Sequence, residues 1–283
     1  MIASLPLSRR FRWTFAAYVL VFFVYLAAPL LVVGVFAFND SRFPALPWQG
    51  FTLDWFLAND AQRTGLFHDR AILRSIGTSA LVASCVTLLS VSLATLNAFL
   101  FERHSFPGKN LLFILMLLPL VIPGVILGIS ILVFASRIAN YFDFNHDIML
   151  DMLRPGLLLV VLGQFAFLTT IATLVISARL RTFDRQLEEA ACNLGATPLM
   201  AVMTVTLPFL APAIIGSALV CFLMSFENFN TTLMLVGSDA PLTITLFSRL
   251  REGATPVLNA VSLLLMLGSM LLALVSIRVQ KRA

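Results

Sequence analysis

Long apolar runs, almost free of charged residues and separated by short polar segments, dominate the pattern of hydrophobic and polar positions along this chain. Each run is close to the roughly 20 residues that a helix needs to cross a bilayer. The pattern therefore predicts an all-α integral membrane protein with about six transmembrane helices in a single domain, residues 1–283. The expected spans are 13–38, 75–101, 110–136, 155–178, 207–236 and 255–277, with a polar loop at 179–206.

Composition supports a membrane location and leaves little room for a soluble domain. Hydrophobic residues make up 59% of the chain and charged residues 12%, against about 25% charged in soluble proteins, and the mean hydropathy is +0.95. The longest connection, 39–74, is large enough for one or two small helices. The first apolar run is about 26 residues, longer than the roughly 7 to 15 of a signal-peptide core, so we expect it to remain as an anchor.

The charged and nucleophilic residues narrow the possible functions. Basic flanks beside anionic lipid headgroups explain the net charge of +5, and we expect no nucleic-acid partner. Three cysteines, an odd number, imply no disulfide framework. The three histidines are scattered without the spacing of metal ligands, so we expect neither a metal site nor catalytic residues in this chain.

The distribution of Lys and Arg predicts the orientation of the spans, because both favour the cytoplasmic side of short loops. Placing both termini inside puts the two basic terminal clusters and the loop 179–206 on the cytoplasmic side. The basic residues of the inner face are then Arg9, Arg10, Arg12, Arg103, Lys109, Arg179, Arg181, Arg185, Arg278, Lys281 and Arg282. The polar loop is therefore expected to face the cytoplasm.

The polar loop between the fourth and fifth spans carries the most specific pattern in the chain. Asp184 can cap a short helix whose first turn holds Glu188 and Glu189, where acidic side chains complement the positive end of the helix dipole. Ala190 and Ala191 follow and leave a bare surface that a partner can approach closely. The pattern predicts a short helix suited to docking against another protein.

Residues after this helix predict a sharp turn and a second helix. Gly195 permits the left-handed conformation that commonly ends a helix. Thr197 followed by Pro198 is a common helix opening, with Thr as the cap and Pro in the first turn. The loop should therefore be an elbow of helix, turn and helix that protrudes from the membrane.

The complete spacing of the elbow is Glu-Ala-Ala, three residues, Gly, nine residues, an aliphatic residue, one residue and Leu-Pro. The residues concerned are Glu189, Ala190, Ala191, Gly195, Val205, Leu207 and Pro208. This spacing resembles the cytoplasmic signature of permease subunits in bacterial ATP-binding-cassette importers, with Val205 where Ile is usual. From about Arg70 to the carboxyl end the chain is similar to the spermidine/putrescine-type second permease. An ordinary amphipathic connection is the alternative, but the full spacing arises by chance less readily than a lone Glu-Ala-Ala.

The resemblance implies a type I importer permease fold in the bacterial inner membrane, multi-pass with both termini in the cytoplasm. It also implies that the elbow is a coupling helix seated in a groove of a cytoplasmic ATPase. The residues implied in this coupling are Glu188, Glu189, Ala190, Ala191, Gly195, Val205, Leu207 and Pro208. The chain contains no phosphate-binding loop, so ATP and Mg would be bound by the ATPase and this chain would be a non-catalytic subunit without a cofactor. Two ATPase copies, a second homologous permease and a periplasmic or extracytoplasmic solute-binding protein are the implied partners, and a permease homodimer stays open.

A polar island lies within the fifth apolar run. Placing the carboxylate of Glu227 in hydrocarbon near a helix centre costs roughly 2.5 to 3.5 kcal/mol of insertion free energy, so it should face a watery path or a partner. With Asn228 and Asn230 it could offer charge and amide oxygens to a cationic amine, while Phe226 and Phe229 could form apolar gate contacts. The alternatives are that Glu227 is wetted near the outer surface or pairs with an arginine of a partner subunit.

Several other residues carry structural expectations. Pro119 and Pro123 should kink the third span, and the two glycines in 124–128 should let helices approach closely. Trp48 and Trp55, in the longest connection, are expected to anchor at the membrane interface.

Three classes of function are compatible with a six-span membrane domain. The leading hypothesis is a permease subunit that imports polyamines or similar small cationic amines by alternating access, driven by a partner ATPase. The same importer class could instead carry a phosphonate, an iron chelate or another small organic solute. A secondary transporter is less favoured, because there is no convincing internal repeat between the two halves. A channel or a membrane-embedded enzyme comes third, because Glu227 stands alone among the spans.

Overall fold

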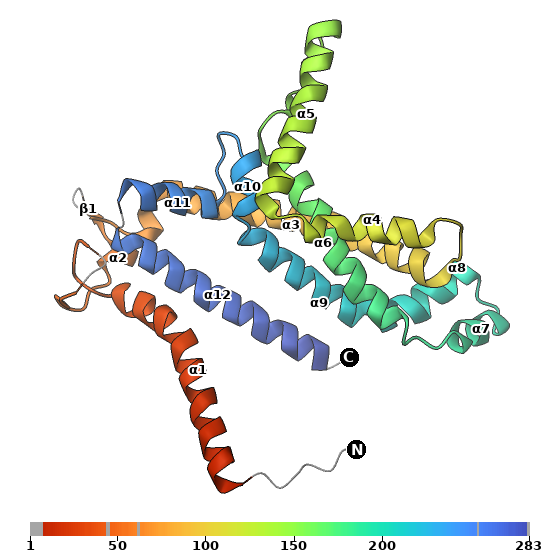
Figure 1. Cartoon of the computed structure of the whole chain (residues 1–283), viewed down its shortest axis with the longest axis horizontal. Coiled ribbons are helices and arrows are strands. Elements are labelled where there is room, and N and C mark those ends of the chain that lie inside the picture. The colour runs from red at the N-terminus through yellow and green to blue at the C-terminus, as the bar shows by residue number, and fades with distance from the viewer. Residues whose placement is uncertain (1–7, 44–45, 61–62, 254, 282–283) are drawn as a thin grey trace. The chain divides into compact units, whose positions relative to one another are not determined.

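The computed structural model describes residues 8–43, 46–60, 63–253 and 255–281, with side chains up to residue 274. Among the basic residues expected at the inner face, Arg282 lies outside the described residues, as do the side chains of Arg278 and Lys281. The chain divides into two compact units: Met1–Arg70 with Arg249–Leu267, and Ala71–Ser248 with Gly268–Ala283. Helices form almost all of the regular structure in both units (Figure 1).

The predicted all-α membrane architecture is confirmed. Six helical segments in the described part of the chain are long and apolar enough to cross a bilayer. They are Arg9–Phe36, Arg70–Arg103, Gly124–His146, Leu157–Leu180, Pro198–Phe226 and Pro256–Leu274. Their apolar outer surfaces, which would be unfavourable in water, are suited to contact lipid or other membrane helices.

The first unit contains a long apolar helix and a short folded segment after it. Helix α1 (Arg9–Phe36) begins at Ser8, whose hydroxyl accepts the N–H of Phe11 at 3.2 Å. The short elements that follow are α2 (Asp54–Leu57), β1 (Asn59–Asp60), β2 (Arg63–Thr64) and η1 (Leu66–His68). The two strands pair antiparallel as a small hairpin. The last helix, α12 (Pro256–Lys281), begins in this unit.

The second unit is a bundle built around one buried helix. Its elements are α3 (Arg70–Arg103), α4 (Lys109–Val121), α5 (Gly124–His146), η2 (Asp151–Leu153), α6 (Leu157–Leu180), α7 (Gln186–Asn193), α8 (Pro198–Ala201), η3 (Val202–Thr206), α9 (Leu207–Phe226), α10 (Asn230–Leu235) and most of α11 (Leu242–Glu252), whose last four residues belong to the first unit. Helix α6 is the most buried of the spans, and its apolar side chains form the centre of the core together with residues from α3, α9 and α10. The polar loop α7–α8 therefore emerges directly from the helix that the others surround.

Two of the expected spans are divided. The third is split into α4 and α5 at Ile122–Pro123, because proline disfavours a helical conformation of the preceding residue and Ile122 is extended with ψ of 127°. Pro119 lies inside α4 and does not end it. The fifth is split after Phe226. Phe229 is in the cap position of α10, and the amide oxygen of Asn228, one residue earlier, accepts the N–H of Thr232 at 3.3 Å and its hydroxyl at 3.0 Å.

A buried polar network holds the break between α9 and α10 against α6. Gln164 of α6 is 1% exposed, and its Nε2 donates to Oγ1 of Thr232 at 2.9 Å. The hydroxyl of Ser225, in the last turn of α9, donates to Oε1 of Gln164. One amide therefore bonds to both sides of the break, which fixes the geometry where an apolar side chain would leave two hydroxyls without these partners.

Glycines let α5 and α6 approach α10 closely, as expected for the pair in 124–128. A Cβ added to Gly128 would lie 3.0 Å from Cβ of Met234, and one added to Gly163 would lie 2.4 Å from Cδ1 of Leu235. Thr231 lies between these contacts and donates its hydroxyl to the carbonyl of Gly124 at 3.3 Å. The short helix α10 is thus enclosed by two spans and cannot shift without moving them.

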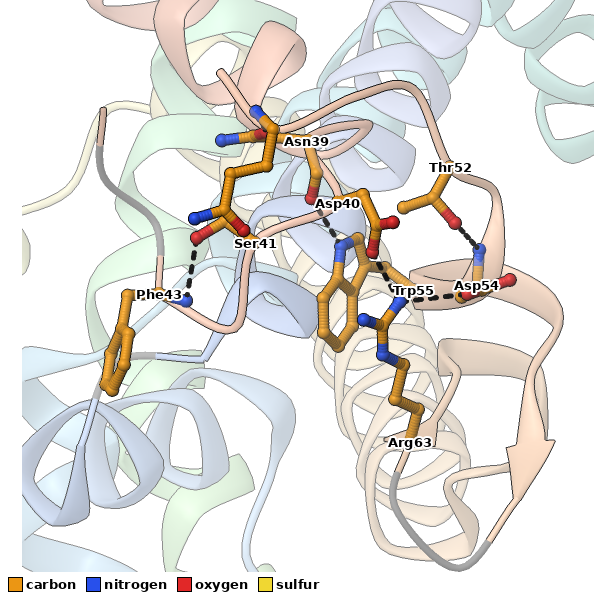
Figure 2. A network of polar contacts seen from close by, with 9 residues as sticks. Asn39, Asp40, Ser41, Phe43, Thr52, Asp54, Trp55 and Arg63 are labelled. Carbon is orange, nitrogen blue, oxygen red and sulfur yellow. Dashed lines mark hydrogen bonds and ion pairs between the residues drawn. The ribbon is translucent and has the colours of Figure 1, made fainter. Parts of the chain in front are cut away.

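The segment between α1 and α3 folds around Trp55 (Figure 2). This side chain is 5% exposed, and its Nε1 donates to the carbonyl of Asn39 at 2.7 Å. The guanidinium of Arg63 lies over the indole ring at 5.1 Å and pairs with Asp40 at 2.5 Å and Asp54 at 2.9 Å. Trp55 is therefore a packing centre of this segment, and its expected place at the membrane interface was wrong. Trp48 is 46% exposed, and its interface role stays a prediction.

Candidate functional site

The loop between α6 and α9 has the helix, turn and helix predicted from its sequence. Asp184 accepts the N–H of Gln186 at 3.0 Å, although α7 begins at Gln186 and the residue in the cap position is Arg185. Gly195 ends the helix with φ of 96°, in the region that favours glycine. The N–H of Ala196 then donates to the carbonyl of Ala191 at 3.1 Å, which satisfies a terminal carbonyl of the helix.

The second half of the elbow returns the chain to the membrane. Thr197 caps α8 by accepting the N–H of Met200 at 3.3 Å, with Pro198 in the first turn as predicted. The next five residues, η3, form a π-helix and lead without interruption into α9. Short π-helical turns are rare and occur frequently at functional sites, because the extra residue per turn re-aims the side chains that follow.

The elbow presents a small-residue and apolar surface. Glu189 and Ala190 are exposed on α7. Around them the exposed fractions are 90% for Leu194, 73% for Leu199 and 56% for Met200. Leu199 and Met200 lie at the start of the segment that becomes the fifth span, whereas Leu194 lies on the polar loop, where a large exposed apolar side chain is typical of a surface that another protein covers.

Glu188, one residue before the exposed Glu189, points into the protein. Its carboxylate makes a bidentate pair with Arg103, the last residue of α3, at 2.5 and 2.8 Å. Both side chains of this pair are 16% exposed. The hydroxyl of Thr206, the last residue of η3, donates to the same carboxylate. The hydrogen bonds from Arg103 hold the pKa of Glu188 below its ordinary value, and that of Thr206 acts in the same direction against partial burial.

The last three residues of the predicted coupling set lie where the chain enters α9, away from the apex of the elbow. Val205 is half-buried and packs against the core cluster, and Leu207 is also half-buried. Pro208 stands in the first turn of α9, directly after the π-helix η3. Their position suits shaping the start of the span, and a role in coupling stays a prediction for all three.

The polar island of the fifth run lies at the break between α9 and α10. Glu227 is exposed and caps α9 at its carboxyl end, and Asn230 is exposed at the start of α10. Asn228 is half-buried, and its amide oxygen already accepts from Thr232. A role of Asn228 in offering that oxygen to a solute is therefore less suited to the geometry than a role in holding the break.

The two phenylalanines of the island pack in different directions. The ring of Phe229 lies 4.9 Å from that of Phe247 in α11, and the ring of Phe226 stacks on Phe222 at 6.0 Å. Phe229 thus connects the break to α11, which the sequence did not indicate. Whether either ring gates a path stays a prediction.

Three functional candidates were not identified from the sequence: Arg103 and Thr206, which bond to Glu188, and Gln164, which holds the break. Arg103 had contributed only to the orientation argument, since nothing local connects it to a glutamate 85 positions away. Gln164 did carry a signal, because a glutamine in the middle of an apolar span needs polar partners.

Comparison with known proteins decides the family. A model of the family described as "Binding-protein-dependent transport system inner membrane component" matches residues 87–282, which include the elbow, the break and four of the six spans. The chain belongs to this family. The family match runs from within α3 to the carboxyl end and does not include α1 or the segment around Trp55.

The relatives of this family member transport different solutes. The chain is 32% identical to the putrescine transport system permease protein PotI of Escherichia coli (strain K12) over 246 residues, covering 86% of this chain and 82% of the relative. It is 24% identical to the spermidine/putrescine permease PotC of Haemophilus influenzae, covering 92% and 93%. The sulfate transport system permease CysT of Salmonella typhimurium is 25% identical, covering 80% and 83%.

Solved structures support the same fold. A bacterial transporter that imports the acidic polysaccharide alginate contains a chain with a TM-score of 0.74 at 18% identity, covering 95% of this chain and 96% of that one. The same transporter type in complex with a pentasaccharide-bound periplasmic protein gives a TM-score of 0.68 at 16% identity, covering 94% and 92%. At this identity the likeness concerns the fold, which is that of importer permeases.

Proposed function

We propose that this chain is the permease subunit of an ATP-driven importer that moves polyamines or similar small cationic amines into the cytoplasm. Membership of the binding-protein-dependent transport family supports the importer class. The observation that carries the coupling role is the elbow, whose exposed Glu189 and Ala190 are surrounded by exposed apolar side chains on a loop anchored between α6 and α9. A partner that covers this surface could move both helices.

The partners follow from the geometry of one elbow per chain. Two cytoplasmic ATPase subunits each need an elbow, so a second, homologous permease would supply the other. A solute-binding protein outside the membrane would deliver the solute, as in the periplasmic-protein complex of the alginate transporter. ATP binding would draw the two ATPase subunits together and move the elbows, and the bundle would open alternately to the two sides.

The substrate assignment rests on the charge at the break. Glu227 caps the carboxyl end of α9, where the helix dipole already carries partial negative charge. A carboxylate added to this end gives a negative site that favours a cation and disfavours an anion. Asn230, at the start of α10, is a second exposed polar member of the island. The identity with the putrescine permease agrees with a cationic amine, whereas the sulfate permease indicates that family membership alone does not fix the charge of the solute.

Uptake by the reconstituted complex tests this assignment. The purified permeases, ATPase and binding protein are placed in proteoliposomes, and uptake of radiolabelled putrescine is compared with that of sulfate. We expect ATP-dependent putrescine uptake in the wild type. In Glu227→Gln, which removes the charge and keeps the size, we expect about a tenfold higher half-saturating concentration of putrescine–binding protein complex, as for loss of one charge contact. Asn145→Asp, an exposed change at the end of α5, is the control for a general effect of charge.

Two results would count against the proposal. Uptake of sulfate without uptake of any polyamine would contradict the cationic substrate. Unaltered putrescine uptake by Glu227→Gln would remove Glu227 from the path and leave the importer class intact.

A further inference from the structure

The elbow is fastened to a helix that is not its neighbour in the chain. Glu188 of α7 and Arg103 at the end of α3 form a bidentate pair, with two parallel N–H···O contacts at 2.5 and 2.8 Å. Bidentate pairing fixes the orientation of both side chains as well as their distance. Because each side chain is only 16% exposed, water competes with this pair far less than with an ordinary surface ion pair.

Aromatic rings enclose the arginine of this pair. The guanidinium of Arg103 lies 5.6 Å from the ring centre of Phe99 and 5.6 Å from that of Phe183. Phe183 in turn packs edge-on against Phe209 of α9 at 5.1 Å. The planar cation is therefore held between rings from α3 and from the approach to α7, which restricts the geometries that it can adopt.

A third segment joins the same carboxylate. Thr206 is 0% exposed and ends the π-helix η3, and its hydroxyl donates to Glu188. One side chain of α7 thus contacts α3 through Arg103 and the entry to α9 through Thr206. The hydrogen bond from Arg103 lowers the pKa of Glu188, so the carboxylate stays ionised at neutral pH.

A second connection lies beside the first. Glu102, adjacent to Arg103, pairs with Arg181 at 2.9 Å, and its carbonyl accepts from Nη2 of Arg185 at 3.0 Å. Both arginines belong to the segment that leads from α6 into α7. Two consecutive residues at the end of α3 are therefore bonded to the base of the elbow, so a displacement of α7 cannot leave α3 in place without breaking several charged contacts.

We propose that Arg103, Glu188 and Thr206 form a joint that passes the movement of the elbow to α3 and α9 at once. The inference rests on the proposed coupling function. It divides the two adjacent glutamates by role, since Glu189 faces outward toward a partner and Glu188 is a positioning residue that makes the elbow rigid. Without the joint, α7 would keep its two chain ends and the contacts of Glu102 with Arg181 and Arg185 at its base, and it could move further in response to a partner before α3 follows.

The test is a double-mutant cycle in the complete complex, with solute imported per ATP hydrolysed as the readout. Arg103→Gln and Glu188→Gln should each lower this ratio by about tenfold, within the usual range of coupling between sites. The double variant should be no worse than either single variant, because both changes break the same contact. Glu189→Gln, on the same turn but facing outward, should lower the retention of the ATPase. Glu252→Gln, the same change at an exposed residue outside the elbow, is the control and should leave the ratio unchanged.

A milder variant and a direct measurement keep the test decisive if the charge variants do not assemble. Thr206→Val has a similar shape and removes only the hydroxyl, and it should lower the ratio by about threefold. Amide hydrogen exchange of α7 in the purified full chain should be faster in Thr206→Val and in Glu188→Gln than in the wild type. This readout needs no ATPase, so it separates the joint from the proposed function.

Three results would contradict the proposed joint. Assembled Arg103→Gln and Glu188→Gln complexes with the wild-type ratio would do so, as would effects that multiply in the double variant. If only Thr206→Val assembles, an unaltered ratio together with unaltered exchange of α7 would contradict it. A wild-type complex that retains no ATPase would instead refute the proposed function.

Discussion

Gln164 offers a direct test of how the break between α9 and α10 is held. In Gln164→Leu the side chain keeps a similar volume and loses both of its bonds, one to Thr232 and one to Ser225. Hydrogen bonds between membrane helices contribute about 0.6 kcal/mol each on average. Two lost bonds therefore lower the free energy of unfolding by about 1.2 kcal/mol, which is close to the 1.4 kcal/mol that corresponds to a tenfold change in an equilibrium constant.

The assay is reversible unfolding of the purified chain in detergent, followed by circular dichroism, for Gln164→Leu and a matched control. Thr173→Val is suitable, because Thr173 is also on α6 and 0% exposed, but its hydroxyl donates to the carbonyl of Thr169 in its own helix at 2.8 Å. We expect the control to lose less than half as much stability. Equal losses in the two variants, or no loss in Gln164→Leu, would refute the argument that this amide fixes the break.

Two further predictions concern the elbow. Ala190→Trp places a bulky ring on the exposed face of α7, so a tagged chain should retain much less ATPase on copurification. Ala190→Ser is the control and should retain the ATPase. Equal retention by the two variants would remove Ala190 from the docking surface. Because Arg103 lowers the pKa of Glu188, the pair stabilises the folded chain above the ordinary Glu pKa of about 4.3 and its contribution is lost only as the pH falls through the lower folded value. The difference in Tm between the wild type and Glu188→Gln should therefore be full at neutral pH and shrink in acid, and a pH-independent difference would contradict this.

Local features of the elbow could be predicted from the sequence because each depends on residues close together in the chain. Gly195 has the positive φ that its place after a short helix requires, and Thr197 caps the next helix as its pairing with Pro198 indicates. The spans were predictable for a similar reason, since the length and hydropathy of a run decide whether it can cross a bilayer.

Features that depend on distant partners could not be predicted. Glu188 and Glu189 have the same chemistry and are adjacent, and the contacts of Glu188 with Arg103 and Thr206 separate a half-buried glutamate from an exposed one. Tryptophan is a residue type that commonly anchors at the membrane interface, yet Asn39 and Arg63 enclose Trp55 in a folded segment. In both examples the contacting residues are too far apart in the sequence for periodicity or motif spacing to reveal the contact.

The break at Glu227 could be predicted in part. A polar island in an apolar run indicates a special position, but it does not say whether the helix continues through it. The hydrogen bonds of Asn228 to Thr232, and of Gln164 across the break, decide that it does not.

The central claim, that the elbow docks on an ATPase at the cytoplasmic side, is tested most directly by labelling Cys192. This thiol is exposed on α7, whereas Cys221 is buried in α9, and Cys85 can be replaced by serine. The account predicts that a membrane-impermeant maleimide labels Cys192 in inverted vesicles but not in right-side-out vesicles, and that assembly with the ATPase protects it. Labelling from the outside, or labelling that the ATPase leaves unchanged, would contradict the account.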